Sequence, residues 1–141
     1  MIILLPTVKH TGSHFCLKQL LKGFVPIQLK TAKKDIKLLS GDMVVFDHLY
    51  KHKMRLWRDL LKEYPAIVPL RNKKAVMESW MSRGENLEDF HEQWAMLKSI
   101  VCKRVYFINI DDPLMRERQL ETINFDLGLN LDPGKWEVIR K

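Results

Sequence analysis

The chain has 141 residues, of which 46% are hydrophobic and 29% are charged. These values are typical of a single globular domain, residues 1–141. No stretch approaches the roughly 18 consecutive apolar residues that a membrane-spanning helix requires, which excludes that class. The two cysteines, Cys16 and Cys102, have no metal-ligand spacing. We expect both to be reduced core thiols of a cytoplasmic protein.

The formal net charge of +7 is unevenly distributed along the chain. Residues 1–58 contain 11 basic and 3 acidic side chains, whereas residues 59–141 contain 13 basic and 14 acidic ones. A positive field over the first part favours an anionic ligand. A solvated lysine-rich face explains Lys30, Lys33, Lys34 and Lys37 equally well.

Short apolar runs alternate with stretches of helical periodicity. The last helical stretch has proline in its first turn and ends at Gly128, and another follows Asn86, which is a typical N-cap. In chain order, the patterns predict a strand over 2–5, a helix over 15–22, strands over 24–29 and 43–46, a helix over 51–64, a strand over 67–70, a helix through Trp80, a helix after Asn86, a strand over 105–110 and a helix over 112–129.

This alternation predicts an α/β fold with three layers, in which helices flank a mainly parallel sheet of four to five strands. Ligands of such sheets bind at the carboxyl ends of the strands. Three predicted strands run into polar segments at that end, namely TVKHTGSH, DHLYKHK and RNKK. We therefore expect the functional residues to lie in these three segments.

The first segment has the composition of an anion-binding turn. Gly12 allows the backbone to turn tightly, and the helix that follows presents unpaired N–H groups at the positive end of its dipole. The GxxxxGK[ST] pattern of a Walker A loop is absent. The side chains that add charge or hydrogen-bond donors here are Lys9, His10, Thr11, Ser13 and His14.

Taken together, the three segments resemble the sulfotransferase family, whose donor is 3′-phosphoadenosine-5′-phosphosulfate (PAPS). HTGSHF is similar to the family's phosphosulfate loop, KSGTTW. This implies that residues 10–14 bind the phosphosulfate and that Phe15 stacks on the adenine. RNKKAVMESW is similar to the family's 3′-phosphate motif, RNPKDVAVSY. It implies that Arg71 and Ser79 bind the 3′-phosphate, for which the planar guanidinium fork is well suited.

The segment VVFDHLY is similar to the family's strand and its KTHLP motif, whose histidine is the catalytic base. The resemblance implies that His48 accepts the acceptor's proton, with Asp47 as a rival base. The chain also departs from the family pattern. His10 stands at the loop lysine, where the adjacent Lys9 could serve, Phe46 stands at the lysine before the catalytic histidine, and no clear copy of the late RKG element is present.

The resemblance therefore implies a P-loop nucleotide-kinase-like fold and a PAPS-dependent sulfotransferase. Such an enzyme transfers a sulfuryl group to a hydroxyl or amine of a small molecule or glycan, and releases adenosine 3′,5′-bisphosphate (PAP). Whether the acceptor is anionic, and whether the second subunit of a homodimer completes its pocket, stay open.

Other functions stay open as well. A PAP- or PAPS-binding relative without turnover fits the same residues. A P-loop-type small-molecule kinase would share the fold and could use Asp47 to bind magnesium, but the loop lysine before Ser/Thr is missing. A nucleic-acid-binding module fits the basic first part, but residues 30–37 contain no aromatic side chain, so we expect no nucleic-acid partner. No His/Cys/Asp cluster has metal-ligand spacing, so we expect no metal.

Several of these residues also have a purely structural interpretation. Arg71 could pair with Glu78 or Asp111 at the end of its strand. Phe15 taken alone fits the core, and Ser79 taken alone fits any helix position that requires a small side chain. Other side chains are expected in the core (Trp57, Trp80 and Trp94) or at the surface (His52 and His91).

Overall fold

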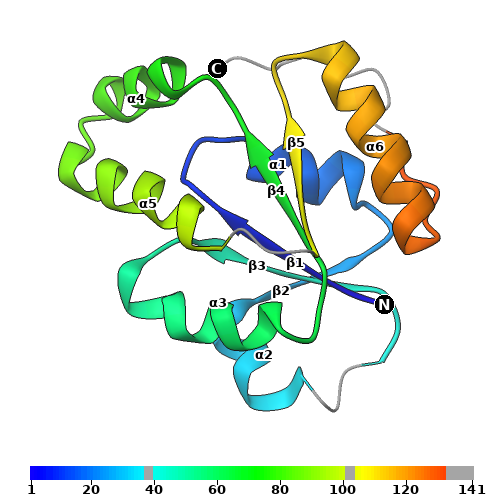
Figure 1. The fold of residues 1–141 in the computed structure, drawn as a ribbon. Helices are drawn as coiled ribbons and strands as arrows, with labels where there is room; N and C mark the ends of the chain where they lie inside the picture. Colours follow the sequence, from blue (N-terminus) through cyan, green and yellow to red (C-terminus); the bar gives the residue numbers. More distant parts are fainter. Residues whose placement is uncertain (37–39, 101–103, 133–141) are drawn as a thin grey trace.

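The computed structural model describes residues 1–36, 40–100 and 104–132 of the chain. Its centre is a parallel sheet of five strands in the order β2-β3-β1-β4-β5 (Figure 1). The predicted three-layer α/β fold is thereby confirmed. The strands are β1 (Ile2–Thr7), β2 (Val25–Gln28), β3 (Met43–His48), β4 (Ala66–Leu70) and β5 (Val105–Asn109).

Helices connect the strands, as parallel pairing requires. The predicted start and stop signals act at two of them. Asn86 accepts a hydrogen bond from the Glu88 N–H before α5, and Gly128 ends α6 with a left-handed φ of 64°. The helices are α1 (Ser13–Phe15), the π-helix η1 (Cys16–Leu20), α2 (Leu29–Asp35), the 3₁₀ turn η3 (Lys51–Lys53), α3 (Met54–Leu61), α4 (Lys73–Ser82), α5 (Leu87–Ser99) and α6 (Pro113–Leu127).

Alternate residues of each strand face opposite sides of the sheet, and each side has its own helices. Leu4 of β1 lies in one cluster with Trp57 of α3 and Phe90 of α5. Ile3 and Leu5 lie in the other cluster, with side chains from α1, η1 and α6. Figure 1 shows α3 and α5 on one side of the sheet and α6 on the other. This packing holds the carboxyl ends of the strands in fixed positions.

The segment between β2 and β3 differs from the prediction. The strand predicted over 24–29 stops at Gln28, and Leu29 begins α2 instead. The sequence pattern predicts no helix here, because Leu29 and Ala32 are the only buried side chains among the residues of this helix whose burial is described. The helix predicted over 15–22 begins earlier, at Ser13, and continues as the π-helix η1.

The aromatic residues are placed largely as predicted. Trp57 and Trp80 are buried in the core, whereas Trp94 is only partly buried against it. His52 and His91 are exposed, as expected. His52 stacks on Tyr50, with ring centroids 5.5 Å apart.

Cys16 is fully buried, and this burial raises the pKa of its thiol to about 12. It is therefore a protonated core thiol, as predicted. Cys102 lies outside the described residues. In the part of the chain that the structure describes, no helix has the length and apolarity needed to cross a membrane. The same part contains no group of three or more His, Cys, Asp or Glu side chains that could hold a metal ion.

Candidate functional site

The sheet has a topological switch point between β1 and β4. These strands are neighbours, but the chain leaves β1 toward β2 on one side and leaves β4 toward β5 on the other. Open α/β sheets bind ligands at the carboxyl ends of strands beside such a point. A hydrogen bond of 3.3 Å from Arg71 Nη1 to the His10 carbonyl joins the two segments that follow these strands. The first and third predicted segments therefore do meet.

The turn after β1 is held by its own side chains. Thr11 is fully buried, and its hydroxyl donates to the Val8 carbonyl at 2.6 Å. His10 has a φ of 70° and Gly12 a φ of 109°, both in the left-handed region. Gly12 thus has the predicted role in the turn. Thr11 therefore stabilises the turn in this conformation.

Replacing Gly12 with alanine should destabilise the protein by about 1–2 kcal/mol, because a left-handed φ strains a residue that carries Cβ. An added Cβ would also lie 3.1 Å from Ile110 Cγ1. Urea denaturation measures the change. Gly128→Ala is the control for strain alone, since it has φ 64° and no neighbour within 4 Å. Gly23→Ala is the control without either effect, since Gly23 has neither a left-handed φ nor a neighbour within 4 Å of an added Cβ. If Gly12→Ala were no more destabilising than Gly23→Ala, the turn geometry would be contradicted.

Lys9 and His10 are held by a carboxylate that the sequence analysis does not identify. Glu85, in the turn between α4 and α5, lies 2.5 Å from Lys9 Nζ and 2.6 Å from His10 Nε2. The backbone of Lys9 is also fixed, since its N–H donates to Gln93 Oε1 at 3.0 Å and its carbonyl accepts from Trp80 Nε1 at 2.9 Å. The α4–α5 pair thereby orients both basic side chains of the turn.

The Glu85 contacts predict a pH dependence of stability. The hydrogen bond from Lys9, followed by that from His10, lowers the pKa of Glu85 in the folded state, although partial burial opposes the shift. A depressed folded-state pKa adds stability above the unfolded-state value of about 4.3, and this stability disappears as the pH falls through the folded-state pKa.

We therefore expect Glu85→Gln to destabilise the protein most above about pH 5, with the difference from the native protein shrinking below about pH 4. Chemical denaturation at a series of pH values from about 3 to 6 measures it. Glu92→Gln, an exposed carboxylate on α5, is the matched control. A difference that stays constant over this range would contradict the contacts of Glu85 with Lys9 and His10.

The second segment places His48 at the end of β3, opposite Thr7 of β1. His48 Nδ1 lies 2.9 Å from Thr7 Oγ1. Burial lowers the pKa of His48; Lys9, His10 and Lys53 lower it further, and Asp47 opposes them. The ring is therefore neutral near pH 7 and able to accept a proton.

The Asp47 side chain contacts different groups from those that the His48 ring contacts. Its Oδ2 lies 2.5 Å from Lys53 Nζ, and its Oδ1 accepts from the His48 N–H at 2.7 Å. Both carboxylate oxygens are therefore engaged. These contacts are consistent with the alternation of side chains along β3, which turns Asp47 away from the His48 ring.

Arg71 follows β4 and pairs with Asp111. Asp111 is one of the two acidic residues, with Glu78, that a purely structural role of Arg71 predicts as its partner. Its Nε lies 3.4 Å from both Asp111 carboxylate oxygens. Ser79 is partly buried on α4, and its carbonyl accepts from the Ser82 hydroxyl. Among the described residues, no hydrogen bond joins the side chains of Arg71 and Ser79. A hydrogen bond thus joins Arg71 to the turn after β1, and among the described residues no hydrogen bond joins the Ser79 side chain to that turn.

Ser13, His14 and Phe15 form α1. Ser13 is partly buried and His14 is exposed, whereas Phe15 is only 3% exposed. The Arg116 guanidinium lies 5.9 Å from the centroid of the Phe15 ring. Phe15 is therefore a core residue in this conformation, with no open face on which an adenine could stack.

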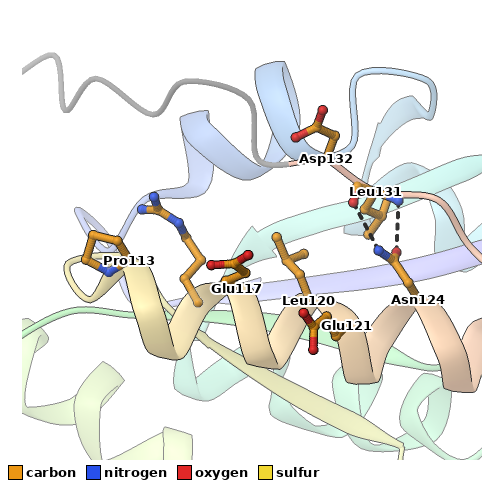
Figure 2. A pocket seen from close by; sticks show the side chains of 8 residues that line it. Pro113, Glu117, Leu120, Glu121, Asn124, Leu131 and Asp132 are labelled. Carbon is orange, nitrogen blue, oxygen red and sulfur yellow. Dashed lines mark hydrogen bonds between the residues drawn. The ribbon is translucent and has the colours of Figure 1, made fainter.

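A pocket of about 390 Å³ lies along α6 and shares no residue with these segments. Figure 2 shows that acidic side chains of α6, including Glu117 and Glu121, stand around Leu120. Two hydrogen bonds between the Asn124 side chain and the Leu131 backbone hold one end of the pocket in place (Figure 2). The lining has three carboxylates, those of Glu117, Glu121 and Asp132, against the one guanidinium of Arg116, and this excess of negative charge does not suit the anionic ligand expected at the sheet edge.

Comparisons with known proteins show the fold. No protein-family model matches the chain, and no curated protein matches it in sequence. Among solved structures, an unliganded sugar kinase from Janibacter sp. HTCC2649 is similar, with a TM-score of 0.61, 9% sequence identity, and coverage of 94% of this chain and 95% of that chain. The architecture is thus α/β and P-loop-like, as predicted. At this identity the likeness shows the fold alone.

Proposed function

We propose that the chain is a nucleotide-dependent transferase whose site lies at the carboxyl ends of β1, β3 and β4. The observation that carries this proposal is the convergence of Lys9, His10 and Arg71 around one turn, next to a neutral His48. Basic side chains at a switch point suit a phosphate-bearing ligand, and a neutral imidazole suits proton removal from an acceptor.

The donor in this proposal is PAPS. Arg71 stands at the end of β4, where the resemblance to sulfotransferases puts the 3′-phosphate, and it already contacts the turn that would hold the phosphosulfate. In the reaction, the acceptor oxygen or nitrogen attacks sulfur while the bond from sulfur to the phosphate oxygen breaks. His48 takes the acceptor's proton, PAP leaves, and Lys9 and His10 stabilise the charge that develops on the leaving phosphate.

ATP is the second candidate donor, and the similarity of the fold to a sugar kinase favours it. Asp47 would be the carboxylate that binds magnesium, but it is paired with Lys53 here, and the turn lacks a Walker A lysine. A sugar hydroxyl or another small-molecule hydroxyl is a suitable acceptor for either donor. The third candidate, a relative that binds PAP without turnover, differs only in lacking the transfer step.

Binding measurements separate these candidates. PAP, AMP and ATP with magnesium are each titrated into the protein and monitored by thermal shift, with a single-stranded oligonucleotide as a fourth ligand. A ligand at about 100 times its Kd should add roughly 2.7 kcal/mol of stability. Stabilisation by PAP alone supports PAPS as donor, whereas stabilisation by ATP with magnesium alone supports the kinase. Stabilisation by none of the nucleotides would overturn the proposal, and stabilisation by the oligonucleotide alone would replace it.

A further inference from the structure

The hydroxyl of Thr7 has two polar neighbours at the carboxyl edge of the sheet. Thr7 Oγ1 lies 2.9 Å from His48 Nδ1 and 3.4 Å from the main-chain oxygen of Asp47. Thr7 is 1% exposed, so water does not compete for its hydroxyl. Both Thr7 and His48 lie on paired central strands, which fixes the distance between the two side chains.

These two contacts constrain the position of the protons. A hydroxyl carries one proton, and a carbonyl oxygen can only accept. If Thr7 donates to the Asp47 oxygen, the His48 ring must donate its Nδ1–H to Thr7, and both contacts become hydrogen bonds. If Thr7 donates to Nδ1 instead, its oxygen faces the Asp47 oxygen at 3.4 Å with no proton between them. The first arrangement satisfies more of the polar atoms.

We propose that Thr7 is a positioning residue that holds neutral His48 in the tautomer with the proton on Nδ1. The lone pair is then on Nε2, the nitrogen that would accept the acceptor's proton. Among the described residues, no hydrogen bond engages Nε2 of His48. The inference rests on the proposed function, in which His48 is the general base, but the tautomer itself can be measured without any ligand.

Nitrogen-15 NMR of the histidine side chains at about pH 8, where an ordinary histidine with a pKa of about 6.5 is neutral, tests this inference. The His48 signals are assigned by their loss in His48→Gln. We expect the native protein to show a protonated Nδ1 and an unprotonated Nε2. Thr7→Val, which keeps the shape and removes the hydroxyl, should move the proton largely to Nε2, and Thr7→Ser should restore the native pattern.

A native His48 protonated on Nε2, or a pattern unchanged in Thr7→Val, would overturn the inference. If Thr7→Val did not fold, the native and Thr7→Ser spectra would still decide it. With an acceptor in hand, Thr7→Val should lower kcat more than tenfold with little change in KM, and Thr7→Ser should rescue it. Absence of PAP and ATP binding would reject the proposed function while leaving the tautomer result intact, so the two failures are distinguishable.

Discussion

Replacing Arg71 with alanine should weaken PAP binding by roughly ten- to hundredfold. Losing a charge-assisted contact with a phosphate costs about 1.5–3 kcal/mol, which corresponds to that change in Kd. Arg71 is available for this contact because its pairing with Asp111 is long, at 3.4 Å, and its side chain remains 21% exposed. AMP lacks the 3′-phosphate, so its Kd should be weak in the native protein and should hardly change in the variant. Isothermal titration calorimetry measures all four values.

Arg83→Ala is the matched control, since Arg83 is exposed at the end of α4 and lies outside the proposed site. Breaking the exposed pair with Asp111 should cost the fold no more than about 1 kcal/mol, so Arg71→Ala remains folded.

Ser79→Ala tests the second residue of the 3′-phosphate motif. A loss of PAP affinity in Ser79→Ala would support the contact of Ser79 with the 3′-phosphate, and an unchanged affinity would restrict the motif to Arg71. Equal affinities of the native protein for PAP and AMP would end the assignment of Arg71.

Replacing His48 with alanine should reduce turnover by roughly 10²- to 10⁴-fold, the range for a lost general base. PAP affinity should remain within a few fold, since the proposed contacts to PAP come from the segments after β1 and β4. Single-turnover transfer from PAPS to an identified acceptor measures the rate. Because burial lowers the pKa of His48 from its usual value of about 6.5, the native rate should fall on acidification at a lower pH than that of an ordinary histidine, as the ring becomes protonated.

Two further variants make this result specific. His91→Ala, an exposed histidine on α5, should turn over at the native rate. Asp47→Asn should lose less activity than His48→Ala, because both carboxylate oxygens of Asp47 are already engaged. A normal rate in His48→Ala would remove its catalytic role, and a large loss only in Asp47→Asn would transfer that role to the aspartate.

The sequence predicts the fold well because the strands are short apolar runs and the helices carry their own caps. Asn86 and Gly128 act locally, within a few residues of where they stand. α2 escapes prediction because its stability comes from packing Leu29 and Ala32 against the sheet, and only the folded chain supplies that contact. This packing also explains why Leu29 begins a helix, although the sequence pattern predicts that it ends a strand.

The candidate site is less predictable, because its contacts span the chain. The turn after β1 contains an obvious basic pair, but its carboxylate partner, Glu85, comes from a helix connection about half the chain away. The residue types of Thr11 and Phe15 match a ligand-binding motif. In the structure, however, the Thr11 hydroxyl donates to the Val8 carbonyl and the Phe15 ring packs in the core, and no local sequence pattern reveals these contacts. Arg71 could be placed correctly at the sheet edge because it directly follows a strand.

In this structure the carboxylate of Glu85 already occupies the anionic position beside the basic turn. A ligand phosphate or sulfate that takes Lys9 and His10 away from Glu85 exchanges one negative group for another. Its measured affinity is then an exchange constant, lower than the intrinsic affinity of the basic pair. The exchange releases the Glu85 carboxylate, whereas the backbone hydrogen bonds of Lys9 to Gln93 and Trp80 still hold α4 and α5 against the turn after β1.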